Sequence, residues 1–308
     1  MEHSRFVHLH CHTEYSLLDG ANKVDKLFDR IKSLKQPAVA MTDHGNMFGA
    51  VEFYREAISH GIKPIIGCEI YVAPTSRFER KGVDKGPKEY NNHLILLAMN
   101  QQGYRNLCKL VTLGYMEGFY YKPRIDKELL RELNGGLIAL SACLQGEVSQ
   151  ALSAGNFDKA KNAAETYASI FGDRYYIEIQ DNKLAEQEKV NRLLVELAKE
   201  ISIPVVATND CHYGERDDFY PADDAKAGRR LLARLGEQRD HARRRPKGAR
   251  RSGKGASWRQ DLYRARHRLL KARERLTERE RRRLCAPFER EPLIAEAWAL
   301  KEAFRSIY

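Results

Sequence analysis

The stretch VHLHCHTEYSLLDG near the N-terminus places histidines at alternate positions and an acid shortly after them. In an extended chain, residues two apart point to the same face, so His10 and His12 can converge on one point. Standing alone, such a pair is more often an ordinary surface feature. With Asp19 close by, it also has the composition of a metal-binding pair, and further ligands are then expected elsewhere in the chain.

Candidate ligands of the same kinds recur where short apolar segments end. Each of them alone has a common structural role, as a turn cap, an ion-pair partner or a buried thiol. Their coincidence at segment ends indicates one shared metal site. The further candidates are Asp43, His44, Glu69, His93, Cys143, Asp210 and His212.

The chemistry of these candidates narrows the choice of metal. Mixed imidazole and carboxylate ligands suit zinc, manganese or iron rather than calcium, whose sites contain only oxygen. The candidates outnumber the four ligands of one tetrahedral ion, so we expect two or three divalent ions. Ions clustered in this way activate water and bind both the attacking and the leaving oxygen of a phosphoester. The residues therefore predict phosphoester hydrolysis.

The elements that would position these side chains alternate between short apolar runs and amphipathic stretches, which is typical of βα units. Ligands in a βα barrel converge from the carboxyl ends of the strands, so we expect a closed barrel. A doubly wound open sheet is the alternative, but no GxGxxG follows the first strand. The predicted strands are 5–10, 37–42, 63–72, 93–98, 136–141, 175–180 and 203–208. The predicted helices are 21–35, 47–60, 101–114, 147–154, 158–171 and 183–201, with Asn100 and Asn156 as N-caps.

Charge divides the chain into two parts. Residues 1–213 carry 26 Lys and Arg against 27 Asp and Glu, whereas residues 214–308 carry 27 against 15. We predict a phosphoesterase barrel over 1–213 and an Arg-rich tail over 214–308. The heptad spacing of Leu262, Leu269 and Leu276 favours a basic helix in a tail that is otherwise expected to be disordered.

The cysteine pattern and the hydropathy of the chain indicate the cellular compartment in which the protein is expected to reside. The six cysteines include no CxxC pair, which argues against a zinc ribbon or a disulfide framework. No apolar run is long enough to span a bilayer, and the N-terminus has no apolar signal region. We expect a soluble cytoplasmic protein with reduced thiols and no membrane partner.

A family resemblance rests on several segments that occur in a fixed order over about residues 4–213. They are HLHCHTEYSLLDGA, TDHGNMFGAVEFY, KPIIGCEIYVAP, GFYYKPRID, LIALSACLQGEV and ATNDCHY. Together they closely resemble the polymerase and histidinol phosphatase (PHP) domain found at the N-terminus of bacterial replicative DNA polymerase III alpha subunits.

This resemblance implies an α/β fold, a distorted seven-stranded TIM-like (β/α) barrel with a trinuclear metal site. It also implies, where all ligands are kept, a metal-dependent 3′ to 5′ exonuclease. Asp19, His44 and Asp210 are the expected catalytic residues, Asp43 is expected to orient His44, and His8 is expected to be structural. The implied metal ligands are His10, His12, Asp19, His44, Glu69, His93, Cys143, Asp210 and His212.

The loop YMEGFYYKPRID mixes aromatic and cationic side chains, which suits base stacking and phosphate binding. We predict that Tyr120, Tyr121, Lys122 and Arg124 contact nucleic acid. The alternative, equally weighted, is that this loop only packs over the rim of the barrel.

The function expected from the resemblance is that of the N-terminal PHP part of a polymerase III alpha subunit, with DNA and other holoenzyme subunits as partners. The full-length family synthesises DNA with magnesium at palm aspartates, which are absent here, so this chain is expected to hydrolyse phosphoesters and not to polymerise. Two alternatives are a standalone phosphatase of a small phosphate monoester and a metal-stabilised scaffold without catalysis.

The tail departs from the family after about residue 213. Three explanations are a genuine basic DNA-binding extension, a truncated product and a disrupted reading frame. The jump from 10 arginines before this point to 22 after it favours the disrupted frame.

Overall fold

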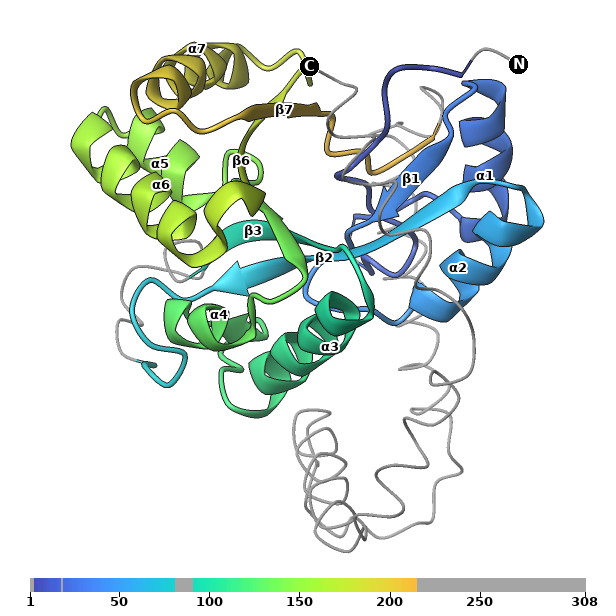
Figure 1. Ribbon diagram of the computed structural model, residues 1–308, viewed down its shortest axis with the longest axis horizontal. Coiled ribbons are helices and arrows are strands. Elements are labelled where there is room, and N and C mark those ends of the chain that lie inside the picture. The colour runs from blue at the N-terminus through green and yellow to red at the C-terminus, as the bar shows by residue number, and fades with distance from the viewer. Residues whose placement is uncertain (1–2, 18, 81–90, 215–308) are drawn as a thin grey trace, which may run out of the picture. The chain divides into compact units, whose positions relative to one another are not determined.

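A computed structural model of the chain describes residues 3–17, 19–80 and 91–214. Its centre is a seven-stranded mixed sheet in the order β1-β2-β3-β5-β6-β7, with β4 paired to β2. The sheet is curved into a distorted barrel (Figure 1). The strands are β1 (Ala38–Met41), β2 (Lys63–Val72), β3 (Asn92–Ala98), β4 (Arg124–Ile125), β5 (Leu137–Leu140), β6 (Tyr175–Gln180) and β7 (Val205–Thr208).

One strand runs against the others, and this decides which side chains meet. β1 is parallel to β2, and β5, β6 and β7 are parallel in succession, whereas β3 is antiparallel to both of its neighbours, β2 and β5. Tyr71 near the end of β2 pairs with His93 at the start of β3. The beginning of β3 therefore lies at the same rim as the carboxyl ends of the other strands.

The predicted strand 5–10 is wrong as a regular strand, although its place in the barrel is right. Isolated bridges pair His8 with Val39 and Cys11 with Cys211. The N–H of Ala40 donates to the carbonyl of His8, and the N–H of His12 donates to the carbonyl of Cys211. This segment links the edge strand β1 to the chain that follows β7, the other edge strand.

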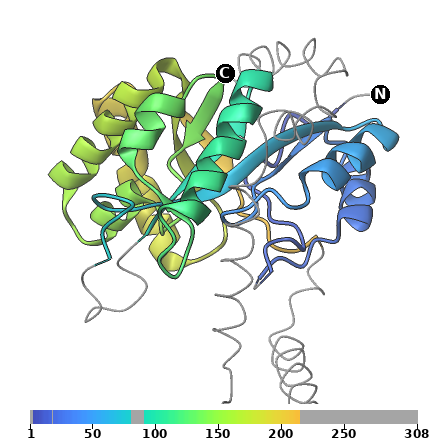
Figure 2. The same cartoon turned by 90° about the horizontal axis from the view of Figure 1, so that it is seen from below.

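Helices surround the sheet in two groups, with the long strand β2 running between them in both views (Figures 1 and 2). The six predicted helices are confirmed with shifted ends, and a short one, α4, is missing from the prediction because KELLREL is less than two turns long. The helices are α1 (Val24–Ser33), α2 (Ala50–Ser59), α3 (Gln101–Met116), α4 (Lys127–Leu133), α5 (Glu147–Ser153), α6 (Phe157–Phe171) and α7 (Ala185–Glu200).

Three apolar clusters hold these layers together. The largest packs α3 to α7 against β2, β3, β5 and β6, a smaller one fills the barrel, and the third packs α1 and α2 against β1. No helix among the described residues is long and apolar enough to cross a membrane. The predicted tail, with its leucine repeat, lies outside the described residues except for Gly214.

Both predicted N-caps are confirmed. The Asn100 side chain accepts a hydrogen bond from the N–H of Gly103 at 2.9 Å, and Asn156 accepts one from Lys159 at 3.0 Å. Each cap satisfies a backbone donor that has no partner within its helix.

We expect Asn100→Ala to lower the free energy of unfolding by about 1 kcal/mol, because the N–H of Gly103 loses its acceptor. The measurement is chemical denaturation of the full chain. Asn162→Ala is the matched control, since this exposed asparagine lies inside α6 and alanine favours a helix interior. Equal losses for the two variants would contradict the capping role.

Candidate metal centre

The deepest part of the centre is formed by the histidines of the N-terminal segment and an acid that follows β7. The Nε2 atoms of His10 and His12 lie 3.1 Å apart. Asp210 Oδ1 is 3.1 Å from the first and 3.2 Å from the second. Both histidines are fully buried, and bridge contacts on either side hold their segment extended, so the alternation predicted from the sequence does direct both rings to one point.

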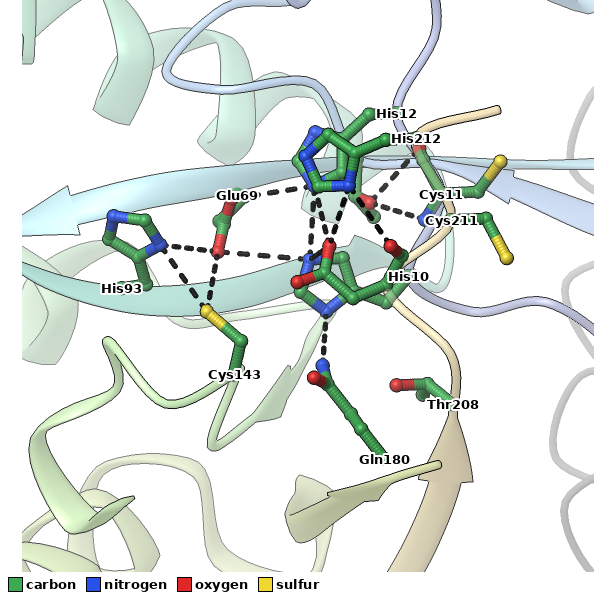
Figure 3. Close-up of polar contacts among 12 residues, drawn as sticks. His10, Cys11, His12, Glu69, His93, Cys143, Gln180, Thr208, Cys211 and His212 are labelled. Carbon is green, nitrogen blue, oxygen red and sulfur yellow. Dashed lines mark hydrogen bonds and ion pairs between the residues drawn. The ribbon is translucent and has the colours of Figure 1, made fainter. Parts of the chain in front are cut away.

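Glu69 lies in the middle of the centre, and its two carboxylate oxygens serve opposite sides of it. Oε2 is 2.5 Å from His44 Nδ1 and 3.5 Å from His12 Nε2, whereas Oε1 is 2.6 Å from His93 Nδ1. Cys143 Sγ lies 3.8 Å from Glu69 Oε1 and 3.7 Å from the same nitrogen of His93. Figure 3 shows His93 and Cys143 on one side of Glu69, with His10, His12 and His212 on the other.

The outer part of the centre is more open to solvent. Asp19 Oδ2 is 3.2 Å from His44 Nε2 and 3.8 Å from His212 Nε2. The ring of His12 stacks on that of His212 with centroids 4.2 Å apart. The Asp19 side chain is 47% exposed, whereas that of Glu69 is 1% exposed, so the centre extends from the barrel interior to its rim.

All nine predicted ligands therefore lie in one continuous cluster. Within the described residues, three overlapping groups have ligand atoms within 4.8 Å of one another. Each pair of groups has one residue in common, His12, His44 or Glu69, so the three groups form one connected cluster. The groups are His12, His44 and His212; His10, His12 and Glu69; and His44, Glu69 and His93.

Backbone conformation turns two of the ligand loops inward. Asp210 has a φ of 51° and Ala142, just before Cys143, has a φ of 64°. Left-handed conformations cost a non-glycine residue about 1–3 kcal/mol and cluster at functional sites. The intervening Cys11 and Cys211 direct their sulfur atoms away from the cluster (Figure 3).

The electrostatics of the centre favour positive charge on two of its histidines, His10 and His44, whereas burial lowers the pKa of His12. Burial alone would lower the pKa of His10, but Asp210 and Glu178 raise it to about 10. Burial likewise opposes the charged form of His44, yet Asp19 and Glu69 raise its pKa to about 10. Burial would raise the pKa of Asp210, but the adjacent histidines lower it to about 2.

The donor set also fits divalent ions. Glu69 Oε2 and Asp210 Oδ1 are buried and accept no aligned hydrogen bond, although histidine nitrogens lie close to both. Oxygen atoms buried in this way call for a cation between them and the neighbouring ring nitrogens. Burial and Glu69 raise the pKa of Cys143, so this thiol must lose its proton to bind a metal.

Glu178, which the sequence analysis missed, contacts His10 directly. Its Oε1 lies 2.7 Å from His10 Nδ1 and also accepts hydrogen bonds from Thr208 Oγ1 and Gln180 Nε2. A carboxylate on the far nitrogen of a ligating histidine fixes the tautomer and orients the ring. The sequence does contain a sign of this role, because Glu178 and Gln180 stand two residues apart in β6 and therefore point to the same face of a largely apolar strand.

Asp43 differs from the prediction that it orients the His44 ring. Its carboxylate instead accepts hydrogen bonds from Thr13 N, Thr13 Oγ1 and Ser16 Oγ. Asp43 therefore stabilises the loop that follows His12.

His8, which the sequence predicts to be structural, contacts the ring of Phe6 edge-on and the thiol of Cys211. Its Nδ1 lies 3.2 Å from Cys211 Sγ, and burial lowers its pKa.

The predicted nucleic-acid loop divides into exposed and buried members. Tyr121 is 60% exposed, and the ring of Tyr120 packs edge-on against it at 4.7 Å. Lys122 Nζ lies 5.2 Å from the ring of Tyr71. Arg124 is wrong as a phosphate ligand, because it is buried and donates to the carbonyls of Gly118, Arg77 and Glu79.

Comparison with known families gives two matches. Residues 8–182 match the family model described as the PHP domain. Residues 231–308 match a different model, described as a transposase. The three explanations offered for the tail stay predictions.

Curated relatives resemble the first part of the chain. DNA polymerase III subunit alpha of Thermus aquaticus is 52% identical over 219 residues, covering 70% of this chain and 18% of that protein. The protein of the same name from Treponema pallidum is 51% identical over 224 residues, covering 72% of this chain and 19% of that protein. The chain thus spans about a fifth of the length of these relatives.

Solved structures resemble the chain more distantly. An amidohydrolase from Chromobacterium violaceum is 12% identical with a TM-score of 0.40, covering 67% of this chain and 87% of that one. A two-domain protein from Bacteroides vulgatus containing a predicted PHP-like metal-dependent phosphoesterase is 13% identical with a TM-score of 0.37. That match covers 69% of this chain and 53% of the other.

We expect metal binding to release protons at neutral pH. His10 and His44 have pKa values raised to about 10, so they are protonated at pH 7 and must lose those protons to bind a cation. Zinc affinity should therefore rise with pH up to about 10. Calorimetric titration with zinc in buffers of different ionisation enthalpy measures the protons released. An affinity that does not change between pH 6 and pH 8 would contradict this assignment.

Proposed function

The chain belongs to the PHP domain family, and we propose that its barrel is a metal-dependent phosphoesterase that removes nucleotides from a 3′ DNA end. The observation that supports this most directly is the convergence of eight histidine, carboxylate and thiol side chains around Glu69. A centre needed only for structural stability could be closed and buried, whereas this one reaches solvent at Asp19.

The residues that would hold the ions are the nine predicted ligands. His10, His12, Glu69 and Asp210 would hold an ion on the inner side, and Asp19, His44, His93, Cys143 and His212 would hold the others together with Glu69. Two or three ions of zinc, manganese or iron suit this set of donors. Such ions, when bound, would activate water and neutralise the charge of a phosphodiester.

The chain's own residues supply proton transfer and orientation. His44 Nε2 and Asp19 Oδ2 lie 3.2 Å apart at the exposed edge, where the proton that His44 loses on binding an ion can pass to solvent. The pKa of Asp19, which burial would raise, is lowered by His44, so its carboxylate stays charged. Asp210, on the inner side, places one oxygen atom 3.1 Å from His10 Nε2 and 3.2 Å from His12 Nε2.

The exposed loop beside the centre would bind the DNA strand. Lys122 lies over Tyr71, whose ring packs edge-on against His93 at 5.2 Å and parallel to His44 at 6.1 Å. Through these contacts the ammonium group of Lys122 lies near the metal-ligand candidates His44 and His93, where it can bind a phosphate. Tyr121 offers an exposed ring for base stacking, with Tyr120 supporting it from the side.

The relatives' name suggests the wider role. We infer that the barrel serves DNA replication in the cytoplasm, with DNA and the other polymerase III holoenzyme subunits as partners. DNA synthesis itself, which needs magnesium at a palm site, would belong to the longer relatives and not to the barrel.

The test of hydrolysis is nucleotide release from a 3′-labelled primer by the full chain supplied with zinc, manganese or iron. We expect Glu69→Gln to reduce the rate about 100-fold or more, because ion-based charge stabilisation contributes several kcal/mol. His60→Gln is the matched control, since this histidine ends α2 away from the cluster.

Other outcomes would decide between the alternatives. Bound metal with hydrolysis of a small phosphate monoester but not of DNA would favour the phosphatase. Bound metal without either activity would favour the scaffold and overturn the proposed catalysis.

The test of the loop is DNA affinity measured as a function of salt. We expect Lys122→Ala to weaken single-stranded DNA binding and to reduce the salt slope by about one phosphate contact, which corresponds to about 0.7 for a single strand. Tyr121→Ala should weaken binding by about 1–3 kcal/mol without changing the slope. Lys199→Ala, an exposed lysine at the end of α7, is the control. Unchanged affinity and slope in Lys122→Ala would contradict the assignment.

A further inference from the structure

Ser16 is a small residue in the loop after His12, and its hydroxyl contacts three groups at once. Ser16 Oγ lies 2.9 Å from His12 Nδ1, 3.0 Å from Asp43 Oδ1 and 3.1 Å from the backbone nitrogen of His44. The side chain is buried. The chemistry of the three partner groups determines which atom is the donor in each of these hydrogen bonds.

A hydroxyl has one proton to donate and two lone pairs to accept with. The backbone N–H of His44 can only donate, so it uses one lone pair of Ser16. An ionised carboxylate can only accept, so the single proton of Ser16 goes to Asp43. The remaining lone pair faces His12 Nδ1, which must therefore carry a hydrogen.

The acceptor role of Asp43 is supported by its other contacts. Thr13 N donates to Oδ1 at 2.6 Å, and Thr13 Oγ1 donates to Oδ2 at 2.7 Å. The Thr13 hydroxyl itself accepts from the N–H of Tyr15, which leaves its proton for the carboxylate. The carboxylate of Asp43 is thus surrounded by donors, and toward Ser16 it is likewise the acceptor.

We propose that Ser16, supported by Asp43, is a positioning residue that keeps the proton of His12 on Nδ1 and leaves the Nε2 lone pair for a metal ion. Nε2 is the atom that faces the cluster, at 3.1 Å from His10 Nε2 and 3.2 Å from Asp210 Oδ1. The opposite tautomer would direct a hydrogen into that space. The proposal rests on the metal centre of the proposed function.

Ser16 also fixes the chain on either side of it. Its carbonyl accepts hydrogen bonds from the N–H groups of Asp19 and Gly20, and its own N–H donates to Thr13. A Cβ added to Gly20 would lie 1.8 Å from the carbonyl oxygen of Thr13 and 2.9 Å from Ser16 Cβ, so this turn has no room for a side chain. One serine therefore ties His12, the backbone of His44 and the loop that carries Asp19 into one unit.

The first experiment reads the tautomer directly. The full chain, freed of metal by a chelator, is labelled with ¹⁵N-histidine, and the His12 signals are assigned by comparison with His12→Gln. We expect a protonated Nδ1 in the wild type and in Asp43→Asn, because an asparagine oxygen can still accept from Thr13 and Ser16. Ser16→Ala should lose this preference. A wild-type His12 protonated on Nε2 alone would overturn the proposal, even if Ser16→Ala failed to fold.

The second experiment measures zinc affinity by competition with a chelator. We expect Ser16→Ala to bind about 10- to 100-fold more weakly, the usual cost of removing a partner that orients a metal ligand. Ser149→Ala is the matched control, because this buried serine of α5 makes no hydrogen bond through its hydroxyl within the described residues. Wild-type zinc affinity in Ser16→Ala would overturn the proposal.

The tautomer and zinc-affinity measurements, combined with the hydrolysis assay, distinguish a failure of this inference from a failure of the proposed function. If the expected tautomer and the weakened zinc binding are found but neither DNA nor a phosphate monoester is cleaved, the function fails and the positioning role stands. If DNA is cleaved and Ser16→Ala binds zinc like the wild type, the positioning role fails and the function stands.

Discussion

The buried carboxylate of Glu69 is the constraint on which the rest of the centre depends. An ionised carboxylate in a protein interior is costly unless positive charge or hydrogen-bond donors surround it. Here histidines lie on both of its oxygens, and the neighbouring acids in turn raise the pKa of His10 and His44. Acids and imidazoles in this proportion stabilise one another only when cations or protons lie between them, which is the condition that divalent ions satisfy.

The sheet topology explains how residues from distant parts of the chain reach Glu69. Because β3 is antiparallel, His93 at its start meets the carboxyl end of β2. The segment around His10 connects the two edges of the sheet through single bridges and so places its histidines between β1 and the residues after β7. The conformation of Asp210 then turns its carboxylate inward at this same edge.

Much of this arrangement could be predicted from the sequence, because ligand types and strand ends are local features. Six strands, six helices, two caps and the residues brought together around Glu69 follow from local patterns and from the family resemblance. The first strand was wrong because single bridges, and not a ladder, hold it. Arg124 was misjudged because its guanidinium is buried against three backbone carbonyls. One belongs to the nearby Gly118, and the other two belong to Arg77 and Glu79, which are far away in the sequence. Glu178 was missed because its partner lies 168 residues away.

Ser16 illustrates why residues of ordinary type escape a search for metal ligands. A serine has no affinity for these ions that would mark it, and its importance arises only from the three groups that its hydroxyl meets. His10 is held by a carboxylate directly, through Glu178, whereas His12 is held by a carboxylate through a hydroxyl. In both cases a negative charge lies behind the nitrogen that faces away from the cluster. The atom that faces each far nitrogen is a hydrogen-bond acceptor, Glu178 Oε1 for His10 and Ser16 Oγ for His12. An acceptor in that place keeps a hydrogen on the far nitrogen, and the near nitrogen of each ring can then act as a ligand.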